Sequence, residues 1–258
     1  MTIFKQYGEE RSGTNYLKRL FEINFTDAVV FGSVLGWKHG LFQLTNGHAS
    51  PSAKDHEDWV LQKRIEGKIF SVDNYPLPYD EQFLLRAARD LNYLISYKPM
   101  LPWLVSVKRF RFPKREYEEE LVDGLFRRFI ANYKTWLGLP GALVVEHDTL
   151  IDEVKCGRLL RYLQQQHGLQ PRHSDLMIEK SVINASTDHA LLVGNAAFDS
   201  GYYASHRYLN DLPSWIIKLS RQQRFNAHFI DEAVWRPCLE DSKTLNGTCS
   251  LSSANSGR

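Results

Sequence analysis

Gly8-Glu9-Glu10-Arg11-Ser12-Gly13-Thr14-Asn15 is the stretch that decides the fold of this chain. Residues 2–7, before it, are apolar or β-prone, and residues 16–21, after it, place apolar side chains at helical spacing. The pattern predicts a strand, a tight loop and a helix. Backbone N–H groups and the helix dipole at such a loop form an anion site, so we expect a phosphate-type ligand there.

Further short apolar runs and helical patterns alternate along the chain. Residues 92–97 and 142–146 are typical of buried parallel strands. Helical periodicity covers residues 81–91, 117–137, 152–167 and much of 212–235, whereas residues 170–210 are expected to be irregular. Strands alternating with helices predict the α/β class, with a central parallel sheet covered on both faces as a three-layer sandwich.

Length and composition favour one domain. The chain has 258 residues, of which 43% are hydrophobic, enough to bury a sizeable core. We expect one α/β domain over residues 1–240, followed by a polar, flexible tail over residues 241–258.

Charge and cysteine content exclude several classes of protein. The 32 basic and 30 acidic residues give a net charge of +2, too small to indicate a nucleic-acid or membrane partner. The three cysteines show no CxxC spacing, which argues against a disulfide framework and a structural zinc site. No signal peptide or membrane span is recognisable, so we expect a cytoplasmic protein. The sequence has no His/Cys/Asp cluster with convincing ligand spacing, so we expect the protein to need no metal.

The loop differs from that of nucleotide kinases. It has glycine, four residues and glycine, but Thr14-Asn15 follows where a kinase has lysine and then serine or threonine. The cation of the loop, Arg11, precedes the second glycine instead. A kinase of a nucleotide or small molecule therefore remains the alternative enzyme, and an ordinary turn capped by Ser12 or Thr14 is the alternative without function.

The segment Arg-Ser-Gly-Thr-Asn-Tyr-Leu over residues 11–17 resembles the 5′-phosphosulfate loop of sulfotransferases. The resemblance implies a P-loop NTPase-like fold and 3′-phosphoadenylyl sulfate as the sulfuryl donor. It implies that Arg11 contacts the bridging or sulfuryl oxygens, and that the 5′-phosphate is held by Ser12, Gly13, Thr14 and Asn15. Glu9 and Glu10 would repel this anion unless they point away or pair with cations.

Two further segments extend the resemblance to about residues 2–168. The family pairs a basic residue at a strand end with a serine eight positions later, at the start of the next helix, to hold the 3′-phosphate. Lys98 and Ser106 have this spacing, with lysine in place of the usual arginine. Residues 144–150 resemble the strand end that lies near the adenine, with His147 at the position of a tyrosine.

Sulfuryl transfer is an in-line displacement that needs cations on the donor and a base for the acceptor. His39 is the candidate base, because its ordinary pKa suits proton transfer near neutrality, and Lys38 would stabilise the transferred group. A carboxylate in the segment His56-Glu57-Asp58 is the competing base. The acceptor is expected to be a hydroxyl or amine of a carbohydrate or small metabolite, and its identity and the oligomeric state stay open.

Two other clusters complete the candidates. The basic run of residues 108–115 is either a solvated face, neutralised by the acidic residues that follow, or a surface that gathers an anionic ligand or nucleic acid. The aromatic and basic residues 202–208 fall where sulfotransferases have a segment that closes over the nucleotide. A protein that binds the nucleotide but performs no chemistry is the alternative outside the enzymes.

Overall fold

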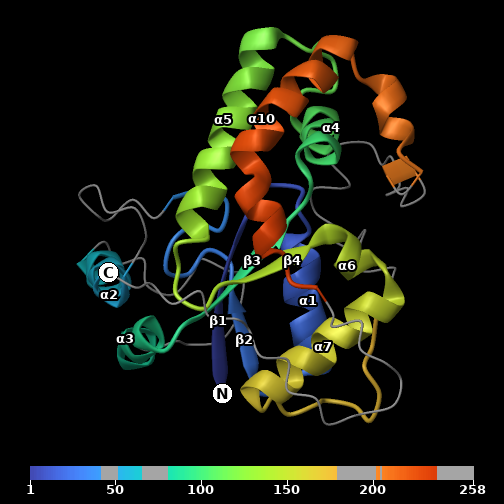
Figure 1. Cartoon of the computed structure of the whole chain (residues 1–258). Coiled ribbons are helices and arrows are strands. Elements are labelled where there is room, and N and C mark those ends of the chain that lie inside the picture. The colour runs from blue at the N-terminus through green and yellow to red at the C-terminus, as the bar shows by residue number, and fades with distance from the viewer. Residues whose placement is uncertain (42–51, 66–80, 179–201, 204, 237–258) are drawn as a thin grey trace, which may run out of the picture.

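The computed structural model describes residues 1–41, 52–65, 81–178, 202–203 and 205–236. At its centre lies a parallel sheet of four strands in the order β2-β1-β3-β4 (Figure 1). The strands are β1 (Thr2–Gly8), β2 (Ala28–Phe31), β3 (Asn92–Tyr97) and β4 (Leu143–Glu146). The expected tail over residues 241–258 lies outside the described part of the chain.

Helices connect these strands, because parallel neighbours need a crossover. The described helices are α1 (Thr14–Asn24), α2 (Ala53–Ile65), α3 (Glu81–Arg89), α4 (Met100–Arg111), α5 (Glu119–Trp136), α6 (His147–Ile151), α7 (Glu153–His167), the 3₁₀ helix η2 (Arg207–Asp211) and α10 (Ser214–Ala233). No helix within these residues is long and apolar enough to cross a membrane.

Both faces of the sheet are covered, since successive strand side chains point to opposite sides. Phe4 of β1 and Leu94 of β3 pack with α1 and α7 on one face. Tyr7 and Ile95 pack with α4, α5 and α10 on the other, where Ile3 also meets α2 and α3. The chain is therefore an α/β protein with helices on either side of a parallel sheet, as the sequence predicts (Figure 1).

The expected elements agree with the structure except at β2, at α2 and at the start of α4. The sequence pattern predicts no strand over β2 and no helix over α2. It also places Ser106 at the start of a helix, whereas α4 already begins at Met100, with Pro99 as its N-cap. That expectation is wrong because proline is tolerated in the first turn, where the missing N–H costs nothing.

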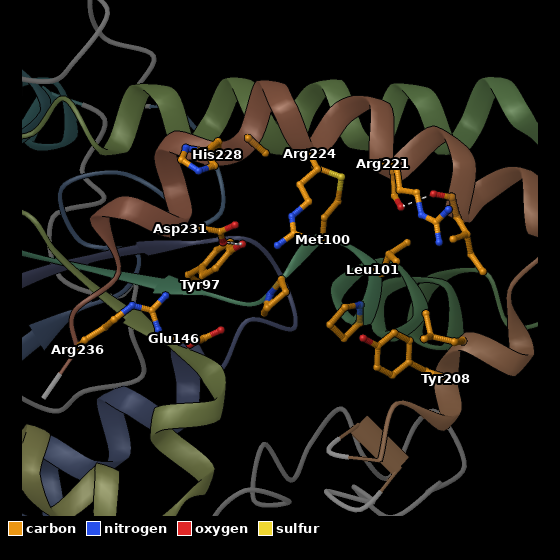
Figure 2. A pocket seen from close by; sticks show the side chains of 16 residues that line it. Tyr97, Met100, Leu101, Glu146, Tyr208, Arg221, Arg224, His228, Asp231 and Arg236 are labelled. Atoms are coloured by element: carbon orange, nitrogen blue, oxygen red, sulfur yellow. Dashed lines mark hydrogen bonds between the residues drawn. The ribbon is translucent and has the colours of Figure 1, made fainter. Parts of the chain in front are cut away.

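A cavity of about 640 Å³ opens between α4 and α10, beyond the carboxyl ends of β3 and β4 (Figure 2). Tyr97 and Glu146, the last residues of those two strands, line its inner end. The carboxyl edge of a parallel sheet is where α/β proteins usually bind ligands, so this edge is the place to examine for a functional site.

Candidate functional site

The loop between β1 and α1 has a conformation that requires glycine at Gly8 and Gly13. Gly13 has φ 96°, and a β-carbon there would lie 3.1 Å from Leu150 Cδ1 and 3.2 Å from His147 Cδ2. At Gly8 an added β-carbon would lie 2.7 Å from the carbonyl oxygen of Ser96. Arg11 also adopts a positive φ, 66°, which is uncommon for a non-glycine residue. The loop is thus shaped by its neighbours and by two glycines.

No side chain caps α1, whose N-cap residue is Gly13. The Ser12 hydroxyl donates instead to the carbonyl oxygen of Glu9 at 2.6 Å, inside the loop. The expected capping of the turn by Ser12 or Thr14 is therefore wrong. The first N–H groups of α1, which carry the partial positive charge of the helix, receive no side-chain cap from the N-cap residue.

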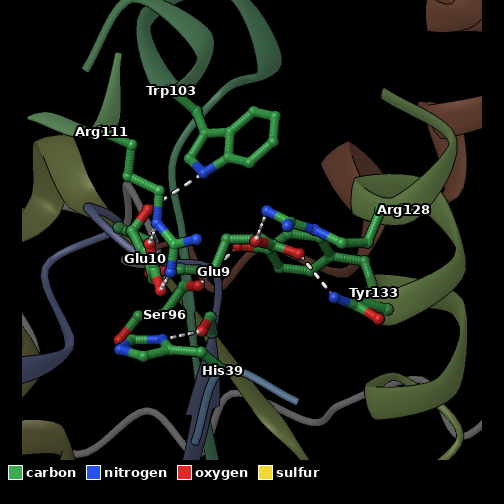
Figure 3. A network of polar contacts seen from close by, with 11 residues as sticks. Glu9, Glu10, His39, Ser96, Trp103, Arg111, Arg128 and Tyr133 are labelled. Carbon is green, nitrogen blue, oxygen red and sulfur yellow. Dashed lines mark hydrogen bonds and ion pairs between the residues drawn. The ribbon is translucent and has the colours of Figure 1, made fainter. Parts of the chain in front are cut away.

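Both carboxylates of the loop are turned toward cations (Figure 3). The buried Glu9 side chain accepts hydrogen bonds from Asn132 at 2.6 Å and Arg128 at 3.1 Å, both on α5. Glu10 forms a two-point ion pair with Arg111 at the end of α4. Their repulsion of a bound anion is correspondingly reduced. Burial raises the pKa of Glu9, although Arg128 and Asn132 oppose that shift.

A second loop, residues 32–40, is fastened against the first. The buried Lys5 of β1 donates to the carbonyl oxygens of Gly32, Val34 and Gly36 at 2.7, 3.0 and 2.5 Å. The Gly8 N–H donates to the Lys38 carbonyl oxygen at 3.0 Å, and the Lys38 ammonium donates to the Asn15 side chain. The structure therefore places Lys38 and His39 beside the loop of residues 8–15.

His39 is oriented by the backbone at the end of β1. Its Nδ1 lies 2.6 Å from the carbonyl oxygen of Gly8, an acceptor, so Nδ1 carries the proton and Nε2 of the neutral ring is left as the proton acceptor. Burial lowers the pKa of His39 to about 4, with Lys38 also contributing. The imidazole is thus neutral at pH 7, which is the state a general base requires.

Lys98 and Ser106 meet in space. The buried Lys98 ammonium donates to the Ser106 hydroxyl at 3.2 Å, across the first two turns of α4. Tyr203 covers both: its ring centroid is 3.8 Å from Lys98 Nζ and its hydroxyl is 3.1 Å from Ser106 Oγ. Burial, assisted by the charge of Arg11, lowers the pKa of Lys98 to about 7. At pH 7 the Lys98 side chain is therefore protonated in about half of the molecules. An anion bound beside it would favour the protonated, charged form.

His147 lies directly against the loop between β1 and α1, with its ring buried. It is the first residue of α6 and is only 6% exposed. Burial lowers its pKa to about 4, so the ring is neutral at pH 7. Its Cδ2 packs on the Gly13 backbone, and stacking on a base would require the ring to turn outward.

Other candidates are held elsewhere. In α2, His56 lies 3.3 Å from the Tyr93 hydroxyl, Glu57 pairs with Arg89 and Asp58 with Lys54. This segment makes none of the contacts that join the two loops. The basic run at the end of α4 is paired as well, since Arg111 binds Glu10 and residues 109 and 115 lie over aromatic rings. Most of these side chains are nevertheless exposed, as expected of a solvated face whose charges are paired with neighbouring groups.

The contacts of two residues at the site, Lys5 and Tyr203, could not be predicted from the sequence. Lys5 reads as a strand residue, and only the three-dimensional course of residues 32–36 shows what it binds. Tyr203 was noticed only within an aromatic cluster, without its contacts to Lys98 and Ser106. Within the described ranges no group of three or more potential ligands could hold a metal ion. No family model, curated protein or solved structure matches this chain.

Proposed function

We propose that this protein is a sulfotransferase that uses 3′-phosphoadenylyl sulfate, on a fold related to that of P-loop nucleotide-binding proteins. One observation carries the proposal. Lys98 and Ser106, eight residues apart, are hydrogen bonded, and Arg11 lies close enough for its positive charge to lower the pKa of Lys98. Two motifs found independently in the sequence thus converge at one edge of the sheet. They supply cations for a ligand with two separate phosphate groups.

In this proposal the 5′-phosphosulfate lies at the N-terminus of α1, with Ser12, Gly13, Thr14 and Asn15 around the phosphate and Arg11 at the sulfuryl oxygens. The 3′-phosphate displaces the Tyr203 side chain and contacts Lys98 and Ser106 in its place. The uncapped helix end and the inward pairing of Glu9 and Glu10 support this orientation. His147 shapes the loop by packing on Gly13.

The transfer step uses the second loop. The acceptor oxygen or nitrogen attacks sulfur, its proton passes to His39 Nε2, and the bond from sulfur to the bridging oxygen breaks. The products are the sulfated acceptor and 3′,5′-adenosine bisphosphate. The tautomer set by the Gly8 carbonyl supports this role of His39, and the position of Lys38 at Asn15 supports its role on the transferred group.

A kinase is the competing enzyme and makes a different demand on the loop. Phosphoryl transfer from ATP needs a lysine after the second glycine and a magnesium ion. Thr14, which occupies that position, is buried and begins α1. The two proposals therefore differ in the nucleotide that binds and in the need for magnesium.

Calorimetric titration separates them. We expect 3′,5′-adenosine bisphosphate to bind without magnesium with a Kd in the micromolar range, roughly −8 kcal/mol. Arg11→Ala and Lys98→Ala should each weaken this binding at least tenfold, whereas Arg161→Ala, on the exposed side of α7, should not change it. Tight binding of ATP with magnesium, and none of the bisphosphate, would refute the sulfotransferase proposal in favour of the kinase.

A further inference from the structure

The cavity between α4 and α10 combines an apolar wall with arginine side chains. At about 640 Å³ it falls in the size range of small-molecule sites. One wall is apolar and comes from α4 and the segment before α10, with Met100, Leu101, Tyr208 and Leu209. None of the residues of the proposed nucleotide site lines it. The cavity is therefore a separate place for a ligand.

The opposite wall is cationic. Arg221 and Arg224, three residues apart, project from the same side of α10, and Arg236 lies beyond the end of that helix (Figure 2). Within the described part of the chain no carboxylate lies within 4 Å of these three guanidinium groups, unlike the arginines that hold Glu9 and Glu10. Guanidinium groups in a concave site bind carboxylates, sulfates and phosphates by two-point hydrogen bonds.

Two acidic residues also line the cavity, and both lie at its inner end with the strands. Asp231 accepts a hydrogen bond from the Tyr97 hydroxyl at 2.8 Å, which fixes the carboxylate there (Figure 2). Burial raises the pKa of Glu146, and Arg236 opposes that shift. Arg236 acts on Glu146 and Arg224 acts on Tyr97 at this inner end, while Arg221, one turn before Arg224 on α10, lines the cavity farther from the strands.

We infer that this cavity is a binding site for a small amphiphilic anion, with its acidic group on Arg221 and Arg224 and its apolar body against Met100, Leu101 and Tyr208. The carboxyl-edge residues Tyr97 and Glu146 line its inner end. The site does not depend on the proposed function, since its residues are distinct from the phosphate loop.

Three naphthalene probes with one ring system and different charge test the inference: 2-naphthoate, 2-naphthylmethanol and 2-naphthylmethylammonium. Calorimetry at pH 7 should show 2-naphthoate binding at least tenfold more tightly than the alcohol, with the ammonium compound weakest. The double variant Arg221→Gln/Arg224→Gln should lose at least tenfold in naphthoate affinity and leave the alcohol unchanged. Arg161→Gln on α7 is the matched control and should behave as wild type.

Charge reversal and the nucleotide variant complete the design. Arg221→Glu/Arg224→Glu should prefer the ammonium probe, and a thermal melt checks that each variant is folded. Arg11→Ala should bind naphthoate normally even though it loses the bisphosphate, so failure of one proposal is distinguishable from failure of the other. Equal binding of the three probes, no binding of any, or unchanged naphthoate affinity in the double variant would overturn the inference.

Discussion

Binding of 3′,5′-adenosine bisphosphate should be coupled to protonation of Lys98. In the free protein the pKa of this lysine is about 7, below the ordinary 10.5, because the ammonium is buried and Arg11 is near. A phosphate dianion beside it favours the charged form and raises the pKa again. Binding above pH 7 therefore requires proton uptake, and the affinity must fall as the pH rises.

The magnitude follows from this pKa. The fraction of Lys98 that is charged falls from about one half at pH 7 to about 3% at pH 8.5, so the Kd should rise about 15-fold over this interval. Calorimetry in two buffers of different ionisation enthalpy should detect uptake of nearly one proton at pH 8.5. The nucleotide phosphates are already mostly dianionic above pH 7 and contribute little to the change.

Lys98→Arg is the matched control, because arginine stays charged throughout this range. We expect this variant to bind the bisphosphate with a Kd that varies less than twofold between pH 7 and 8.5, and without proton uptake. The reasoning is refuted if the wild-type Kd is equally flat, or if Lys98→Arg retains the full pH dependence.

Three further predictions follow from the loops. His39→Asn keeps a donor for the Gly8 carbonyl but removes the base. Transfer of the labelled sulfuryl group from the donor to an acceptor should slow roughly 10²- to 10⁴-fold with an unchanged Kd for the bisphosphate, and an unchanged rate would contradict the role of His39. Glu9→Gln should stabilise the protein more at pH 7 than at pH 4 in urea unfolding, because burial raises the pKa of Glu9, and the stability present with the proton bound is lost as the pH rises through that pKa. Gly13→Ala should cost ~1–2 kcal/mol and abolish nucleotide binding, since φ is 96° there, whereas Gly124→Ala, in open space on α5, should be neutral or stabilising.

Local sequence patterns were sufficient where an element is long or buried. β1, α1 and β3 were predictable because apolar periodicity and turn residues agree there. β2 has only four residues, too few for a periodic signal. The start of α4 was placed at Ser106 by the resemblance alone, whereas the helix begins at Met100 with Pro99 as its N-cap, where proline is tolerated.

The candidate site was predictable only as separate pieces. The sequence suggested the loop, Lys98 with Ser106, and His39, and the structure shows them at one edge of the sheet. Contacts between distant segments could not be read from spacing. Glu9 binds Arg128 and Asn132, which lie 119 and 123 residues away, and nothing local marks them as its partners.

A crystal structure of the protein with 3′,5′-adenosine bisphosphate tests the central claim most directly. The proposal predicts the 5′-phosphate at the N-terminus of α1, in contact with residues 12–15, and the 3′-phosphate between Lys98 and Ser106 with Tyr203 displaced. A nucleotide bound elsewhere, in the cavity between α4 and α10 for example, or with its phosphates away from Lys98, would contradict it.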